Sequence, residues 1–175
     1  MTAKSIAIIG ECMVELSGQP FTAMQQNYGG DSMNTAIYLK KLAGNEVNVN
    51  YVSAMGTDPL SRALIEKWQA HHINTDNVLL SHNKQPGLYM IQNDVSGERT
   101  FQYWRSDSAA KYLLQHADFK KVLTSLAEVD AIYLSGISLA ILAEQDFHTL
   151  LSHLALLKQQ GIKIIYDSNY RPALW

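Results

Sequence analysis

The chain has 175 residues, of which 47% are hydrophobic, so it can bury a sizeable core and is not expected to be disordered. Its 14 basic and 16 acidic residues give a net charge of −2 and are scattered, which argues against nucleic acid as a partner. The sequence contains neither an apolar run that could span a bilayer nor a signal-peptide pattern, so we expect a cytoplasmic protein without a membrane partner.

Predicted strands and helices alternate along most of the chain. In chain order they are a strand at 6–9, a helix from Ser32 to a stop at Gly44, a strand at 47–53, a helix beginning at Asp58 and Pro59, a strand at 131–134, a helix at 146–160 and a strand at 162–166. Strands joined by helices imply right-handed parallel crossovers. The prediction is therefore an α/β fold, an open and mostly parallel sheet with helices on both faces.

Two stretches, at approximately 12–29 and 86–105, break this alternation. The second contains strand patterns at 87–92 and 100–104 around a turn that includes Asp94, which indicates a hairpin. Strands that arrive without crossover helices fit poorly in a parallel sheet. We therefore predict a small antiparallel β lid over a cleft, interleaved in sequence with the main sheet.

The loop at 28–34 places two glycines immediately before a helix. Adjacent glycines let main-chain N–H groups approach a ligand closely, and Asp31 and Asn34 add polar side chains. The unpaired N–H groups of a helix N-terminus favour hydroxyl, carboxylate or phosphate oxygens. The alternative is that Gly29 and Gly30 form a plain turn and Asp31 caps the helix.

Polar side chains gather where the predicted strands end, the edge at which open α/β sheets bind ligands. They are Glu11, Glu15, Asp31, Asn34, Asp167, Asn169 and Arg171, with Tyr89, Tyr103 and Arg105 from the predicted lid. Arginine can grip a carboxylate through two hydrogen bonds and tyrosine can bond to sugar hydroxyls, which suggests a small polyhydroxy acid as ligand. In the alternative, Glu11 pairs with a surface lysine, Tyr103 packs in the hairpin and Asp167 caps a turn.

Other reactive residues give weaker signals. Cys12 stands alone, so it cannot form an intramolecular disulfide, and we expect it to be a small buried residue. The six histidines lack metal-ligand spacing, so no metal site is predicted. The order of serines and glycine at 135–138 does not match a nucleophile elbow, which argues against hydrolase chemistry.

Several of these segments together resemble a known family. They are 9–16, the 28–34 loop, Gly-Thr-Asp at 56–58, Gly-Leu-Tyr at 87–89, 97–101, Tyr-Trp-Arg at 103–105, 134–137 and Asn-Tyr-Arg-Pro at 169–172. Between Ile6 and Trp175 the chain resembles the ribokinase-like (PfkB-type) superfamily of carbohydrate kinases. The Gly-Leu-Tyr, Tyr-Trp-Arg and Asn-Tyr-Arg segments are similar to the branch that acts on a keto-deoxy sugar acid.

The resemblance implies a set of binding residues and two cofactors. The implied substrate-binding residues are Gly30, Asp31, Ser32, Met33, Asn34, Tyr89, Tyr103, Trp104, Arg105 and Arg171. The implied cofactors are ATP and Mg²⁺, with Asp167, Asn169 and Arg171 near the nucleotide. The alternatives are another sugar kinase, such as a fructokinase, and a non-catalytic sugar-acid-binding module.

The sequence departs from the family at its carboxyl end. Family members supply a catalytic aspartate from a Gly-Ala-Gly-Asp helix start, and neither this motif nor a Walker-type segment occurs here. We therefore expect no catalytic residue within these residues and the nucleotide-binding half to lie beyond Trp175. An incomplete sheet would expose apolar edges, so we also expect pairing with a second copy, for example through the lid.

Overall fold

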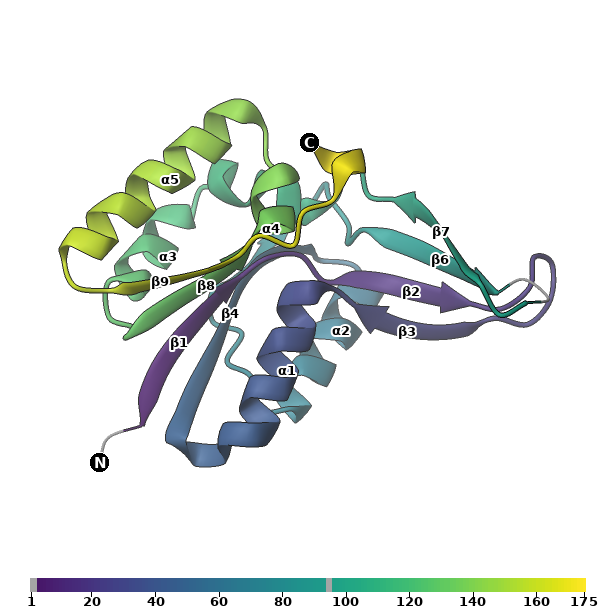
Figure 1. Ribbon diagram of the computed structural model, residues 1–175, viewed down its shortest axis with the longest axis horizontal. Coiled ribbons are helices and arrows are strands. Elements are labelled where there is room, and N and C mark those ends of the chain that lie inside the picture. Colours follow the sequence, from purple (N-terminus) through teal and green to yellow (C-terminus); the bar gives the residue numbers. More distant parts are fainter. Residues whose placement is uncertain (1–2, 94–95) are drawn as a thin grey trace.

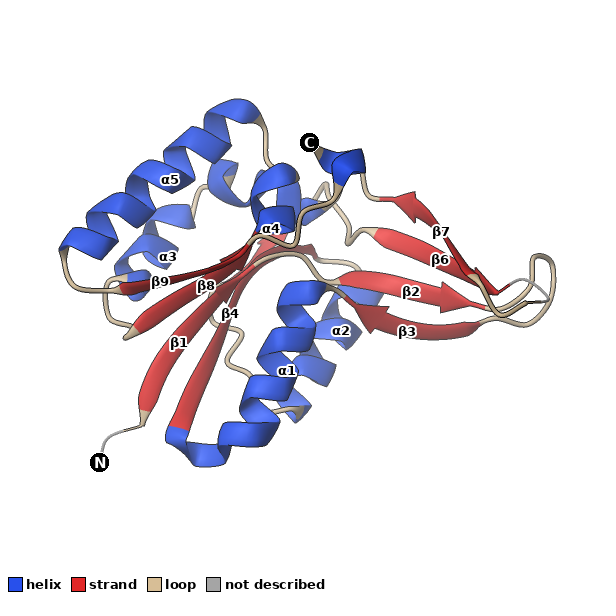
Figure 2. Cartoon of the chain, in the orientation of Figure 1, coloured by secondary structure: helices blue, strands red, loops and turns tan. Residues whose placement is uncertain are grey.

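The computed structural model describes residues 3–93 and 96–175 and forms two sheets (Figure 1, Figure 2). The strands of the larger sheet are, from edge to edge, β5 (Val78–Ser81), β4 (Val47–Gly56), β1 (Lys4–Ile9), β8 (Ala131–Ser135) and β9 (Lys163–Asp167). Every adjacent pair in this sheet is parallel, which confirms the predicted parallel sheet.

Helices cover both faces of this sheet, as predicted. They are α1 (Asp31–Ala43), α2 (Pro59–Ala70), α3 (Phe119–Leu126), α4 (Gly136–Ala140) and α5 (Glu144–Gln159), with 3-10 turns at Gly44–Glu46, Ala109–Gln115 and Pro172–Leu174. Helices α1 and α2 lie on one face, and α3 and α5 lie on the other (Figure 1). None of the described helices is both long enough and apolar enough to cross a bilayer.

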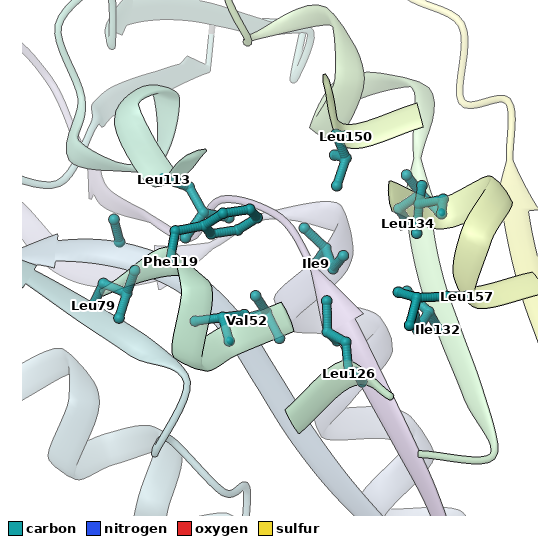
Figure 3. Close-up of a cluster of buried hydrophobic side chains, with 14 of the residues drawn as sticks. Ile9, Val52, Leu79, Leu113, Phe119, Leu126, Ile132, Leu134, Leu150 and Leu157 are labelled. Carbon is teal, nitrogen blue, oxygen red and sulfur yellow. The ribbon is translucent and has the colours of Figure 1, made fainter. Parts of the chain in front are cut away.

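The strand side chains alternate between two separate cores. Ile8 of β1 packs with Tyr51 and Trp68 in the core under α1 and α2. Its neighbour Ile9 points to the opposite face and joins the core that includes Phe119 of α3 and residues of α5 (Figure 3). This alternation is the two-residue period of a strand buried on both faces.

The two predicted helix starts have different outcomes. The Asp58 side chain caps α2 by accepting a hydrogen bond from the Ser61 N–H at 3.0 Å, and Pro59 is the first helical residue, as predicted. The alternative in which Asp31 caps α1 is wrong, because Asp31 is the first residue inside the helix and the N-cap residue is Gly30, which has no side chain to cap it. Gly44 ends α1 with a φ of 54°, as the sequence indicates.

The smaller sheet contains the predicted hairpin but is mixed rather than antiparallel. Its strands are, in order, β3 (Gln25–Gly29), β2 (Met13–Ser17), β6 (Leu88–Asn93) and β7 (Arg99–Trp104). The pairs β2–β3 and β6–β7 are antiparallel, whereas β2 and β6 run parallel, which the long segment of chain between them permits. Asp94, assigned to the hairpin turn, lies outside the described residues.

Candidate functional site

A cavity of about 470 Å³ lies where the smaller sheet meets the carboxyl ends of β1, β8 and β9. Its lining residues are Glu11, Met13, Gly30, Asp31, Asn34, Tyr89, Phe101, Tyr103, Arg105, Ile137, Asn169 and Arg171. Seven of these lining residues are predicted substrate-binding residues: Gly30, Asp31, Asn34, Tyr89, Tyr103, Arg105 and Arg171. This is the edge of an open α/β sheet at which ligands bind.

The start of α1 presents only some of its predicted residues to the cavity. Asp31 and Asn34 line it, because residues three apart share one face of a helix. Ser32 and Met33 are fully buried on the face turned toward the sheet, and the Ser32 hydroxyl lies 2.9 Å from the Tyr51 hydroxyl. The side chains of Ser32 and Met33 therefore lie outside the cavity lining, and substrate binding through the main chain of these two residues stays a prediction.

Gly30 allows the first turn of α1 to pack against the main chain. A Cβ at this position would lie 2.3 Å from the carbonyl oxygen of Glu11, closer than real atoms approach. Glycine at position 30 therefore lets two main-chain segments of the cavity wall touch each other, whether or not a ligand also lies against it.

Aromatic side chains of the smaller sheet form one wall of the cavity. The ring centroids of Phe101 and Tyr103 are 6.2 Å apart, and those of Tyr89 and Tyr103 are 5.9 Å apart. The Tyr89 hydroxyl donates a hydrogen bond to Glu15, and burial, reinforced by this bond, raises the pKa of Tyr89. Tyr89 is thus a protonated, anchored ring rather than a free hydroxyl.

Trp104 was predicted to bind substrate but belongs to a different surface. Alternation along β7 turns it away from the side occupied by Tyr103. It lines a separate cavity of about 620 Å³ together with Lys84 and Asp107, whose side chains form an ion pair at 2.5 Å. Tyr103 contributes to the lining of both cavities, whereas Trp104 lines only this one of the two. The structure therefore removes Trp104 from the lining of the 470 Å³ cavity.

Arg105 and Glu11 form a buried ion pair in the cavity wall. The Arg105 Nη2 donates to Glu11 Oε2, and only 14% and 3% of the two side chains are exposed. The alternative in which Glu11 pairs with a surface lysine is therefore wrong. Burial raises the pKa of Glu11, although the Arg105 guanidinium favours the ionised form.

The segment after β9 brings its polar residues to the same place. The Asn169 Nδ2 donates to Asp31 Oδ2 at 2.8 Å, and Arg171 also lines the cavity. Asp167 lies outside the lining and accepts a hydrogen bond from the Asn169 N–H at 3.1 Å, which is the turn-capping role named as its alternative. A nucleotide-binding role for Asp167, Asn169 and Arg171 stays a prediction.

Three apolar residues of the lining were not predicted from the sequence. Phe101 could have been found, because it shares the strand parity of Tyr103. Met13 and Ile137 carry no comparable signal, since their approach to the cavity depends on the packing of β2 and α4. Glu11 was noted near the site but was not assigned to it.

Metal-ligand clusters are not found in the described part of the chain. Within residues 3–93 and 96–175, no group of three or more His, Cys, Asp or Glu side chains could hold a metal ion. We therefore assign Mg²⁺ to none of these residues. Cys12 is 1% exposed and unpaired, which confirms the expected buried residue.

Known proteins resemble the chain over almost all of its length. The model of the pfkB family carbohydrate kinases matches residues 3–175. The chain is 55% identical to the 2-dehydro-3-deoxygluconokinase of Haemophilus influenzae over 173 residues, covering 98% of this chain and 55% of that protein. It is 47% identical to the protein of the same name from Dickeya dadantii over 176 residues, covering 100% of this chain and 56% of that protein.

A solved structure supports the fold. The crystal structure of 2-dehydro-3-deoxygluconokinase from Thermotoga maritima matches with a TM-score of 0.83 at 23% identity, covering 98% of this chain and 53% of that one. The chain thus spans about half the length of the relatives that it matches.

Proposed function

Because the chain belongs to the pfkB family of carbohydrate kinases, we propose that its cavity binds the sugar acid in a 2-dehydro-3-deoxygluconokinase reaction. In that reaction the γ-phosphoryl group of ATP is transferred to the 6-hydroxyl of 2-dehydro-3-deoxy-D-gluconate. ATP is the co-substrate, so a cytoplasmic location is part of the proposal.

The observation that carries this proposal is the presence of two arginines in the lining of one cavity. Arg105 arrives from the end of β7 and Arg171 from the segment after β9, so distant parts of the chain converge on the same space. A guanidinium matches a carboxylate in shape and charge and can bind it through two parallel hydrogen bonds. The presence of both arginines in one cavity therefore favours an acidic ligand over a neutral sugar.

The other lining residues have the chemistry that a polyhydroxy chain requires. The Asp31 carboxylate can accept hydrogen bonds from hydroxyl groups, and the Asn34 amide can donate and accept them. Tyr89, Phe101 and Tyr103 provide an apolar wall that excludes water from one side of the ligand. These residues therefore have binding and orienting roles in the proposal, and none of them is assigned a role in the chemical step.

The proposal is tested by titrating the chain with 2-dehydro-3-deoxygluconate and, separately, with fructose in a calorimeter. We expect binding of the acid to be the stronger, and the R105A variant to lose about 1.5–3 kcal/mol of it, since a charge-assisted hydrogen bond is removed. Arg62, an exposed arginine on α2, provides the matched control R62A, which should bind as the wild type does.

Other outcomes would contradict the proposal in distinct ways. Stronger binding of fructose, with R105A unchanged, would point to a fructokinase-like specificity. In a protein that also carries the nucleotide-binding half expected beyond Trp175, binding of the acid that an ATP analogue does not influence would favour a non-catalytic sugar-acid-binding module.

A further inference from the structure

Glu11 joins the two sheets at the cavity. It lies between β1 and β2, whereas its partner Arg105 follows β7, and 94 positions separate the two residues in sequence. Glu11 is 4% exposed, and its carboxylate faces the same cavity as the Arg105 guanidinium. The contact therefore connects the central parallel sheet to the last strand of the smaller sheet.

The surroundings leave the Glu11 carboxylate little freedom to move. A Cβ on Gly87 would lie 2.7 Å from Glu11 Oε1 and 3.0 Å from the Arg105 Cβ, so glycine at 87 makes room for both side chains. Oε1 is buried and makes no hydrogen bond of good geometry with the described residues, although the Ser108 hydroxyl is close enough to favour the ionised form. The carboxylate is thus confined, and its partner among the described residues is the Arg105 guanidinium.

Stability alone is a poor explanation for this pair. Removing two charges from water costs several kcal/mol per ion in proteins, and apolar replacements of buried ion pairs are often equally or more stable. What the pair does provide is a fixed position for a long and flexible side chain. The hydrogen bond to Glu11 uses Nη2, so the remaining guanidinium N–H groups are available as donors to a ligand carboxylate.

We propose that Glu11 is a positioning residue for sugar-acid recognition, holding the Arg105 guanidinium in the cavity wall where it meets the ligand carboxylate. This inference rests on the proposed function and adds to it a residue that acts through Arg105. It has a signature that a merely structural residue would lack, because the effect of removing Glu11 depends on the presence of Arg105.

The test is a double-mutant cycle with the wild type, E11A, R105A and E11A/R105A, each titrated with 2-dehydro-3-deoxygluconate and with fructose. We expect E11A to weaken binding of the acid by about tenfold in the wild-type background and by less than about twofold in the R105A background. Binding of fructose should change little in either background. The E11Q variant keeps an oxygen that accepts from Arg105, so it should restore affinity to within about threefold of wild type.

A matched control separates this effect from loss of a buried polar group. Ser53 in β4 is fully buried and lies outside the cavity lining, and its hydroxyl has no hydrogen-bond partner among residues 3–93 and 96–175. S53A should bind the sugar acid as the wild type does. If E11A does not fold, E11D replaces it in the cycle, because aspartate keeps the charge but retracts it by one methylene and should also weaken binding.

The outcomes distinguish this inference from the proposed function. Sugar-acid binding by the wild type, with equal effects of the Glu11 substitution in both backgrounds, would overturn the positioning role and leave the proposed function standing. A wild-type chain that binds no sugar acid would overturn both.

Discussion

Gly30 illustrates how one absent Cβ shapes the cavity. We predict that G30A lowers the free energy of unfolding by about 1–3 kcal/mol, because the added methyl group would overlap the Glu11 carbonyl oxygen, 2.3 Å from the Cβ position. Chemical denaturation measures this loss. L42A is the control, because Leu42 lies on the surface of α1 and is 86% exposed, so its truncation should change the free energy of unfolding little. A stable G30A would show that the loop can shift without cost.

Glu11 should also make stability depend on pH in an unusual direction. Burial raises its pKa above the ordinary value of 4.5, so the folded chain holds the proton more tightly than the unfolded chain does. Between the ordinary and the raised pKa, ionisation of Glu11 therefore destabilises the folded state as the pH rises.

The comparison between wild type and E11Q isolates this effect. We predict that E11Q gains stability relative to the wild type as the pH is raised from about 4.5. Denaturation curves of both proteins across that range provide the measurement. The raised pKa would be contradicted if the free energy of unfolding of E11Q minus that of the wild type stayed constant or fell as the pH rose.

At the level of the element, the start of helix α2 is predicted by a local signal, the capping residue Asp58. We predict that D58A costs about 1 kcal/mol, because the Asp58 side chain accepts hydrogen bonds from the Ser61 N–H and the Ser61 hydroxyl at the helix start. Thermal or chemical denaturation checks the value, with E66A on the exposed face of the same helix as control. Equal effects of the two substitutions would remove the cap as the cause.

Other elements could not be predicted from local patterns. The strand β5 has four residues and α3 has eight, so neither provides enough periods to stand out. The parallel pairing of β2 with β6 aligns Glu15 with Tyr89, which are 74 positions apart, and no turn signal encodes such a contact. Local patterns therefore predicted four of the five strands of the parallel sheet and the hairpin of β6 and β7, but neither β5 nor the mixed pairing of the smaller sheet.

The residues of the predicted site also differ in how far local sequence patterns could place them. Arg105 and Arg171 could be placed at the cavity because both follow strands whose direction the sequence indicates. The spacing of Met33 and Ala36 in α1 already indicates a buried face, whereas no sequence pattern indicates that the polar Ser32 turns toward the sheet. Element order thus predicts the location of the site, and packing decides which side chains reach it.

At the scale of the whole molecule, two sheet edges carry exposed apolar side chains. On β9, the outermost strand of the parallel sheet, Ile165 is 45% exposed and Tyr166 53% exposed. On β7, the outermost strand of the smaller sheet, Trp104 is 56% exposed. An edge strand with apolar side chains invites pairing with another chain.

A molecule with two such edges can pair with two other copies at once. If each edge pairs with its own counterpart on another copy, each contact is isologous and the two together link copies into open-ended chains. We therefore predict that the average mass of the wild type rises with concentration without stopping at a dimer. Sedimentation velocity over a range of concentrations measures it.

Substitutions at each edge should reduce this assembly stepwise. We expect I165K and W104K each to stop at a dimer, because one edge remains, and the I165K/W104K protein to be monomeric, since a charged side chain blocks each edge. L42K, at an exposed leucine on α1 away from both edges, should assemble as the wild type does. If I165K alone were monomeric, β9 would be the sole pairing edge and the expected contact through the smaller sheet would be wrong.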